Sequence, residues 1–141
     1  MDGIEITIRG ARLADLAAID AIQTGSPEAA KWNPMDYLNQ DCVVGELKSC
    51  VAGFLASRQV GPGEREILNL AVDPAERRKG IGRALLKHEL ARVPGAWFLE
   101  VRGSNLAAVK LYESIGFQRA GRRPDYYYEP AEDAIVMRFV S

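Results

Sequence analysis

Hydrophobic and polar residues alternate over residues 4–9 (IEITIR), and this pattern predicts a strand with one buried face. Over residues 13–24 the apolar residues recur every three positions, which predicts an amphipathic helix that ends near Thr24-Gly25. Two further apolar segments, residues 42–47 and 50–60, flank a short polar turn and predict a β-hairpin. The first half of the chain is therefore expected to supply three strands and one long helix.

The segment between the first helix and the hairpin, residues 26–40, contains two helix-start signals. Ser26-Pro27 and Asn33-Pro34 each combine a capping residue with a proline, so two short helical pieces are expected. The segment also contains Trp32. It is placed either to form a mobile lid or wall over a substrate, or to pack as a simple connection.

The second half of the chain alternates between strands and helices. The apolar run AWFLEV, residues 96–101, suits an interior parallel strand covered on both faces. A strand, a helix and this second strand form one right-handed crossover in an otherwise antiparallel sheet. The expected elements are a strand over residues 66–72, a helix that opens at Gly80 and stops before Pro94-Gly95, the strand 96–101, a helix over residues 105–114 ended by Gly116, and a hairpin of residues 118–128 and 134–140.

Composition describes an ordinary globular protein with a single domain spanning residues 1–141. The chain is 48% hydrophobic and 26% charged, with a net charge of −1 that argues against a general nucleic-acid or membrane-surface binder. Cys42 and Cys50 lack the spacing of metal ligands, so reduced core cysteines in a cytoplasmic protein are expected, with a hairpin disulfide as the alternative. His88 has no second ligand at helical spacing, and no metal site is predicted.

The segment RRKGIGR, residues 77–83, predicts a pyrophosphate site. A helix N-terminus has unsatisfied N–H groups and a partial positive charge, so it attracts phosphate. The two glycines, Gly80 and Gly82, let phosphates approach the backbone because no Cβ is present. The cations before them, Arg77, Arg78 and Lys79, add charge of the right sign.

Three phosphate-binding motifs compete for this segment. A P-loop is excluded because Gly-Lys-Ser/Thr is absent. A dinucleotide fingerprint matches two of three glycines, with Leu85 at the third and Glu100 near the position of the ribose-binding acid. The third, Arg77-x-x-Gly80-x-Gly82, resembles the acetyl-CoA loop of the GCN5-related N-acetyltransferases (GNAT). A glycine-started helix with solvated charges is the structural alternative.

A second informative stretch, LEVRGSNLAAVKLYESIGF, covers residues 99–117. On its helix Asn105, Val109 and Tyr112 fall on one stripe, which places Asn105 and Tyr112 about 10 Å apart along the axis. An exposed stripe of this kind suits a long ligand, and Leu111 and Ile115 are expected to face the core. Asn105 is also a natural helix cap, which is compatible with a ligand contact.

Together with the ending RRPDYYYEPAEDAIVM, these stretches resemble the bacterial ribosomal-protein-alanine N-acetyltransferases within GNAT, mainly over residues 64–140. The resemblance implies the GNAT fold: an α/β (α+β) arrangement with a mixed, mostly antiparallel six- to seven-stranded sheet and helices on both faces. It implies transfer of an acetyl group from acetyl-CoA to a protein N-terminal amine, such as that of ribosomal protein S18. A monomer or weak dimer is expected, with no membrane or direct nucleic-acid partner.

The resemblance also implies roles for individual residues. Glu100 matches the general base and Tyr112 the general acid; without the resemblance, Glu100 would be a strand-end residue paired with Arg102 or solvent. The implied acetyl-CoA contacts are Leu70, Ala71, Val72, Arg77, Arg78, Lys79, Gly80, Ile81, Gly82, Arg83 and Asn105.

Two departures from the family concern peptide specificity. The helix and turn between Arg83 and Glu100 are about one helical turn shorter than in close relatives. Tyr126 to Tyr128 form a run of three tyrosines, where relatives usually have two before a proline. The alternatives are acetylation of a small amine or a lysine side chain, and a non-catalytic acyl-CoA-binding module.

Overall fold

Seven strands form one sheet in the part of the chain that the computed structural model describes, residues 5–26, 33–128 and 131–141. The strands are β1 (Ile6–Gly10), β2 (Asp41–Leu47), β3 (Cys50–Gly61), β4 (Glu64–Val72), β5 (Ala96–Arg102), β6 (Gln118–Tyr128) and β7 (Ala131–Val140). The helices are α1 (Leu16–Thr24), α2 (Pro34–Leu38), α3 (Ile81–Arg92) and α4 (Leu106–Ile115), with 3-10 turns at Leu13–Asp15 and Pro74–Glu76.

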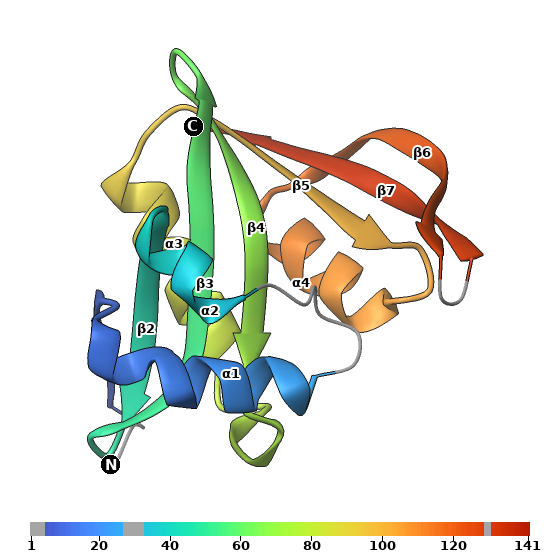
Figure 1. The fold of residues 1–141 in the computed structure, drawn as a ribbon. Helices are drawn as coiled ribbons and strands as arrows, with labels where there is room; N and C mark the ends of the chain where they lie inside the picture. Colours follow the sequence, from blue (N-terminus) through green and yellow to red (C-terminus); the bar gives the residue numbers. More distant parts are fainter. Residues whose placement is uncertain (1–4, 27–32, 129–130) are drawn as a thin grey trace.

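The strand order is β1-β2-β3-β4-β5-β7-β6, and every neighbouring pair except β4 and β5 is antiparallel. The β4–α3–β5 unit therefore supplies the one parallel pair in the described sheet (Figure 1). The mixed, mostly antiparallel sheet predicted from the sequence is confirmed. Its first strand and its hairpins lie at the predicted places, although β4 begins at Glu64 and β7 at Ala131, earlier than expected, because their ladders with neighbouring strands continue to these residues.

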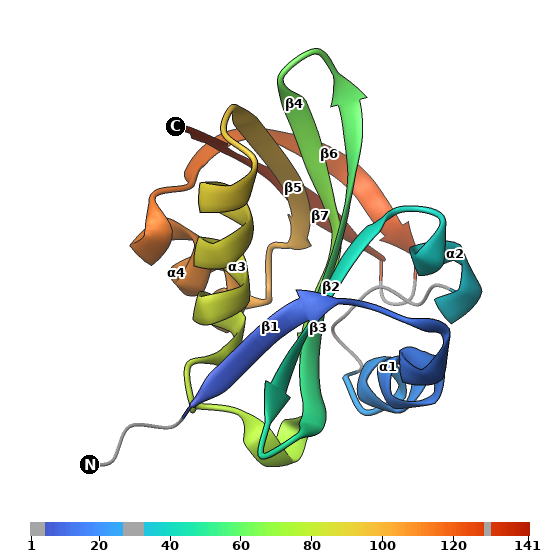
Figure 2. The same ribbon diagram turned by 90° about the vertical axis from the view of Figure 1, so that its left-hand side faces the viewer.

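The sheet separates two hydrophobic clusters, one on each face. Helices α3 and α4 cover one face and α1 and α2 cover the other, as Figure 2 shows. The larger cluster joins α3 and α4 to the sheet through residues such as Leu85, Trp97 and Phe117. The smaller one joins α1 and α2 to it through Ile19, Tyr37 and Phe54, among others.

Local chemistry explains several boundaries. Asn33 caps α2, because its Oδ1 accepts a hydrogen bond from the amide of Met35 at 3.0 Å. Lys48 and Ser49 have φ values of 52° and 67°, as a two-residue hairpin turn between twisted strands requires. The helical start predicted at Ser26-Pro27, and Trp32 with it, lies largely outside the described residues.

Both cysteines are free, in agreement with the expected reduced state, but only one belongs to the core. Cys42 is buried on β2, and burial raises the pKa of its thiol to about 12. Cys50 is exposed at the start of β3, so its predicted core position is wrong. Among the described helices, none combines the length and the apolar character needed to cross a bilayer.

Candidate functional site

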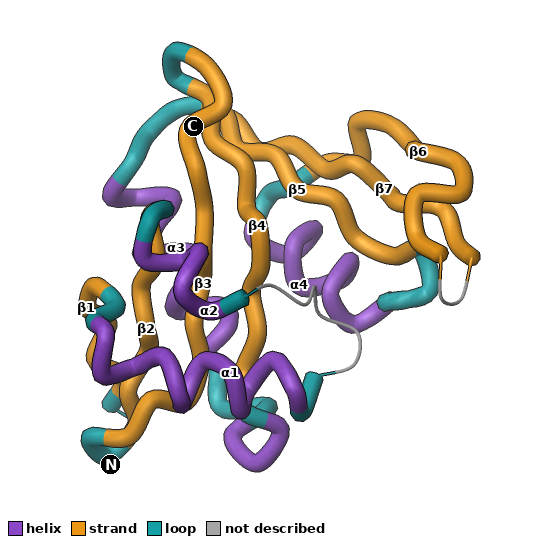
Figure 3. The backbone as a smooth tube through the Cα atoms, viewed as in Figure 1, coloured by secondary structure: helices purple, strands orange, loops and turns teal. Residues whose placement is uncertain are grey.

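A cleft opens where β4 and β5 stop pairing. Their parallel ladder runs only from Glu64–Ala96 to Glu66–Phe98, although β4 continues to Val72 and β5 to Arg102. The two strands diverge beyond this ladder, and α4 lies behind the opening (Figure 3). The cavity has a volume of about 930 Å³ and is lined by β4, β5, α3, α4 and the loop before α3. Ligands commonly bind beyond the carboxyl ends of parallel strands, and this cleft occupies that position.

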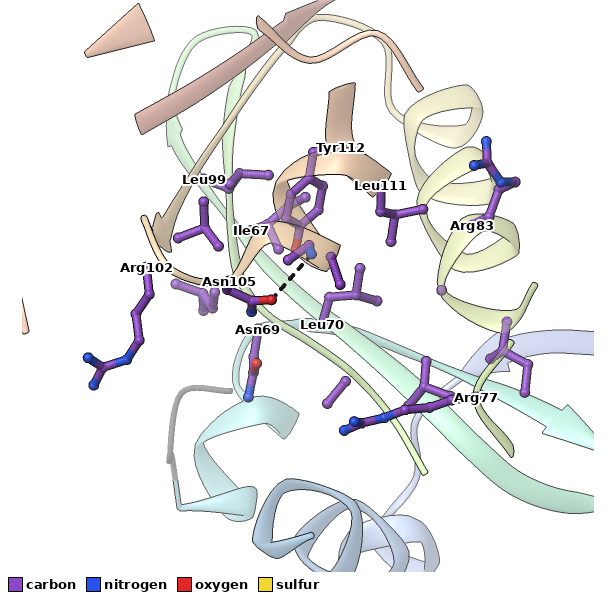
Figure 4. Close-up of a pocket in the computed structure, with 18 of the residues that line it drawn as sticks. Ile67, Asn69, Leu70, Arg77, Arg83, Leu99, Arg102, Asn105, Leu111 and Tyr112 are labelled. Carbon is purple, nitrogen blue, oxygen red and sulfur yellow. Dashed lines mark hydrogen bonds between the residues drawn. The ribbon is translucent and has the colours of Figure 1, made fainter. Parts of the chain in front are cut away.

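The β4 wall contains a bulge, because Ile67 and Asn69 pair with consecutive residues of β3 and Leu68 has no partner there. Bulges re-aim side chains beside functional sites. Here Asn69 points toward α2 (Figure 4), where its Nδ2 donates to the Tyr37 hydroxyl at 3.0 Å. That hydroxyl donates to Gln23 Oε1 at 2.8 Å, and burial raises its pKa to about 12. This buried network fixes α1 and α2 against the cleft.

The start of α3 forms the basic end of the cleft. Gly80 is the N-cap residue with φ 82°, and no side chain caps the helix. The first amides of a helix lack intrahelical partners, so those of α3 remain available to a ligand. A Cβ on Gly82 would lie 3.5 Å from Leu111 and 3.7 Å from Val72, so glycine leaves this part of the cleft open. The loop preceding the helix also places Arg78 in the left-handed region, with φ 68°.

The cations around this helix start differ in their contacts. Arg77 lines the cleft and its Nη2 donates to Ser26 Oγ at 3.1 Å. Arg83 also lines it, and its Nη2 donates to Ser114 Oγ on α4 at 2.8 Å. Lys79 pairs with Glu76 at 2.6 Å and is absent from the lining, so the structure does not place it with the other predicted cofactor residues.

Helix α4 forms the wall opposite β4. Asn105 caps it, with Oδ1 accepting from the amide of Ala108 at 3.2 Å, and also lines the cleft (Figure 4). The predicted exposed stripe is wrong, because Val109 and Tyr112 are buried in the larger cluster while Leu111 lines the cleft. The sheet packs against the Val109–Tyr112 side of the helix. Burial, with Tyr127 nearby, raises the pKa of Tyr112, so its phenol stays protonated at neutral pH.

Glu100 lies on β5 and lines the same cleft. Its Oε1 is 3.0 Å from Arg123 Nε on β6, and its side chain is 13% exposed. The alternative partner, Arg102, instead pairs with Glu132 of β7 at 3.4 Å and stacks over the ring of Tyr127. The alternative pairing of Glu100 with Arg102 is not found, because both residues have partners on other strands.

The cleft gathers Glu100 and Tyr112 with all predicted cofactor residues except Lys79; these are Leu70, Ala71, Val72, Arg77, Arg78, Gly80, Ile81, Gly82, Arg83 and Asn105. Their roles remain predictions. Sequence reasoning missed Asn69 and Arg102, and it named Tyr127 only as part of the run linked to peptide specificity; all three line the cleft. Asn69 alone had a usable signal, since it is a polar residue inside an apolar central strand.

The described residues contain no group of side chains suited to holding a metal ion. The histidine, His88, lies on α3 with its Nδ1 2.8 Å from Glu89 Oε2. His88 therefore contacts Glu89 near the C-terminal end of α3, away from the cleft residues.

Comparison with known proteins gives the following matches. Residues 13–117 match the family model described as the acetyltransferase (GNAT) family. The [ribosomal protein bS18]-alanine N-acetyltransferase of Escherichia coli K12 is 48% identical over 89 residues, which cover 58% of this chain and 60% of that protein. The matched segments span 29% and 60% of the first two curated relatives.

Solved structures match over nearly the whole chain. The ribosomal-protein-S18-alanine N-acetyltransferase of Escherichia coli superposes with a TM-score of 0.80 at 33% identity, covering 96% of this chain and 93% of that one. The protein yncA of Salmonella typhimurium, solved with its cofactor acetyl-CoA, gives a TM-score of 0.79 at 25% identity over 96% and 93% of the two chains.

Proposed function

The chain belongs to the acetyltransferase (GNAT) family, and we propose that it transfers an acetyl group from acetyl-CoA to the N-terminal α-amine of a protein. The observation that carries this proposal is the meeting of Glu100 and Tyr112 in one cleft that ends at the uncapped start of α3. A carboxylate can act as a general base, a protonated phenol as a general acid, and an uncapped helix start can bind phosphate, so these groups suit such a transfer.

The residues present fit acetyl-CoA. The amides at the start of α3 have no side-chain cap, and Arg77, Arg78 and Arg83 line the cleft beside them. Gly80 has no atom within 4 Å of a hypothetical Cβ, so nothing obstructs a phosphate there. The cleft then continues between β4 and α4 toward Glu100, over a volume large enough for an extended ligand.

Acetyl-CoA, when bound, supplies the acetyl group as a thioester. Glu100 accepts a proton from the acceptor ammonium, directly or through a water, because an α-amine with a pKa of about 8 is largely protonated at neutral pH. Backbone N–H groups of β4 near Leu70 stabilise negative charge on the carbonyl oxygen while the C–N bond forms. Tyr112 gives its proton to the departing sulfur as the C–S bond breaks.

A protein N-terminus is the acceptor that the relatives favour. The Escherichia coli relative and the matched crystal structure are both named as alanine N-acetyltransferases of ribosomal protein S18. We therefore propose the N-terminus of S18, or of a protein with a similar beginning, as the acceptor of this chain.

Thiol release from acetyl-CoA tests the proposal. We expect release with a peptide matching the S18 N-terminus and none with the same peptide blocked at its α-amine. Polyamine and aminoglycoside acceptors form the comparison set. A preference for them would contradict the proposed acceptor, and tight acetyl-CoA binding without release on any acceptor would contradict transfer itself.

The roles of the two proposed proton-transfer groups are tested in the same assay. Glu100→Gln and Tyr112→Phe are expected to lose turnover by roughly 10²–10⁴-fold while binding acetyl-CoA normally. The binding measurement separates loss of chemistry from loss of the cleft. Turnover at the wild-type level in either variant would remove the role assigned to that residue.

A further inference from the structure

The two carboxylate oxygens of Glu100 have different surroundings. Oε1 is 3.0 Å from Arg123 Nε. Oε2 is buried and has no hydrogen-bond partner among the described residues. A buried carboxylate oxygen without a donor is costly, and such atoms often mark a place where a ligand group will bind. The side chain is therefore held by Arg123 at Oε1, while Oε2 is enclosed by the protein without a donor.

Two cavities meet at the Glu100 side chain. The carboxylate lines both the main cleft and a second cavity of about 260 Å³ between β3, β4, β5, β6 and β7. Arg123 lines the second cavity and is absent from the lining of the main cleft. The guanidinium thus approaches Glu100 from the second cavity.

Arg123 reaches Glu100 across an intervening strand. Strand β7 lies between β5 and β6, so the two residues are separated by two strand spacings, about 9.5 Å. Arg123 pairs with Ala134 of β7, and Glu100 pairs with Val136, which is also opposite Gly121. The small side chain of Ala134 leaves room for the long arginine side chain to cross β7, and Val136 lines the second cavity beside it.

The position of the guanidinium is fixed by a further contact. Its central carbon lies 5.4 Å from the centroid of the Tyr126 ring, which adds a cation–π attraction. The neighbouring Arg122 instead pairs with Asp133 at 2.8 Å and does not line either cavity. Two adjacent arginines of β6 thus have separate partners, and one of them holds the proposed base.

We propose that Arg123 is a positioning residue for the acetyl transfer: it binds Oε1 of Glu100 and so holds the carboxylate at the main cleft, where Glu100 receives the proton of the acceptor amine. This inference rests on the proposed function. Arg123 touches neither the acceptor nor acetyl-CoA in this arrangement and acts through Glu100. Without it the carboxylate can rotate out of reach, and a misplacement of about 1 Å can lower a rate by roughly a hundredfold.

The test is steady-state kinetics on Arg123→Ala, Arg123→Lys and the matched control Arg122→Ala, with acetyl-CoA affinity and the thermal midpoint measured for each. We expect Arg123→Ala to lower kcat roughly 10- to 100-fold with acetyl-CoA affinity and midpoint close to wild type, because the side chain is 59% exposed. Lysine should restore part of the rate, since it returns a cation near Oε1. Arg122→Ala should behave as wild type.

A double variant decides whether Arg123 acts through Glu100. In the Glu100→Gln background, Arg123→Ala should cause no further loss of kcat. A further loss there, or an Arg123→Ala rate equal to that of Arg122→Ala, overturns the inference while the wild-type activity still supports the proposed function. Absence of transfer by the wild-type protein overturns the proposed function and this inference with it.

Discussion

Helix α3 begins at Gly80 with no side-chain cap and ends in a group of ion pairs around Glu89. At the first end, backbone amides without a side-chain cap face a cleft that is also lined by Arg77, Arg78 and Arg83. At the second end, Glu89 is 1% exposed, and both of its oxygens are bonded, to Arg92 at 2.6 and 2.9 Å and to His88 at 2.8 Å. The same helix thus leaves polar groups unsatisfied at one end and satisfies buried charge at the other.

The ion pairs extend well beyond the helix. Arg92 also binds Asp41 on β2, which pairs with Arg65 of β4 at 2.9 Å. Arg65 lies over the ring of Trp97, whose Nε1 donates to the carbonyl of Val93 just after α3. This Glu89 cluster (Asp41, Arg65, His88, Glu89 and Arg92) ties the C-terminal end of α3 to the sheet, and the buried side chain of Ile81 packs the first turn of α3 into the larger cluster. Unsatisfied groups at a rigid helix end are a feature of binding sites rather than of structural ones.

The largest expected effect comes from breaking the satisfied end. Arg92→Ala leaves the buried Glu89 with His88 alone, and we expect the free energy of unfolding to fall by about 3 kcal/mol, the low end for a broken buried pair because Arg92 is 41% exposed. Chemical denaturation measures this loss. Acetyl-CoA affinity should be unchanged in buffer without denaturant, since the cleft lies at the other end of the helix.

An exposed arginine supplies the control for Arg92. Arg58 pairs with Glu66 at 2.9 Å on the surface of the sheet, and Arg58→Ala should change stability by less than about 1 kcal/mol. Equal losses of unfolding free energy in the two variants would show that the burial of Glu89 does not make its ion pair more stabilising than an exposed one. The proposed difference between the two ends of α3 would then be wrong.

The two ends also differ in how far the sequence could predict them. The open end depends on residues close together in the chain, from Arg77 to Arg83, so glycine positions and charge were sufficient to predict it. The cluster at the other end joins Asp41 and Arg65 to α3, and nothing local in the sequence indicates such a pairing.

The partner of Glu100 is a second contact between distant segments that the local sequence does not indicate. Arg102 was the expected alternative because it lies two residues away on the same strand face, whereas the actual partner, Arg123, reaches across β7. The strands and helix starts were predictable for the opposite reason, since Asn33, Gly80 and Asn105 act on their own segments. The burial of Tyr112 was not, because the side of α4 that packs on the sheet is decided by tertiary contacts.

A smaller effect is expected from filling the open end. Gly82→Val places methyl groups where a phosphate must approach the amides, while its Cβ meets Leu111 and Val72 at ordinary contact distances. We expect the dissociation constant of acetyl-CoA to rise about 30-fold, equivalent to about 2 kcal/mol, with the thermal midpoint retained. Calorimetry of acetyl-CoA binding measures the change, with Gly82→Ala as an intermediate step.

The control for Gly82 is a glycine with free space but no place in the cleft. A Cβ on Gly10 of β1 meets no atom within 4 Å, and Gly10→Val should leave acetyl-CoA affinity unchanged. Normal acetyl-CoA affinity in Gly82→Val would mean that acetyl-CoA does not bind at the start of α3, and it would contradict the proposed phosphate site there.

The smallest expected effect comes from Arg78, in the loop before α3, where one substitution should change stability and acetyl-CoA affinity in opposite directions. Arg78 has φ 68°, a conformation that costs a residue with a Cβ roughly 1 kcal/mol, and it lines the cleft. We therefore expect Arg78→Gly to raise the free energy of unfolding by up to about 1 kcal/mol and to weaken acetyl-CoA binding about threefold at low salt, with the difference shrinking as salt is added. Lys48 has φ 52° in the β2–β3 turn, away from the cleft residues, so Lys48→Gly should give a similar gain in stability without any change in binding. If both variants gain stability and neither loses affinity, the Arg78 charge does not contribute to the site, and the strained arginine needs a different explanation from ligand binding.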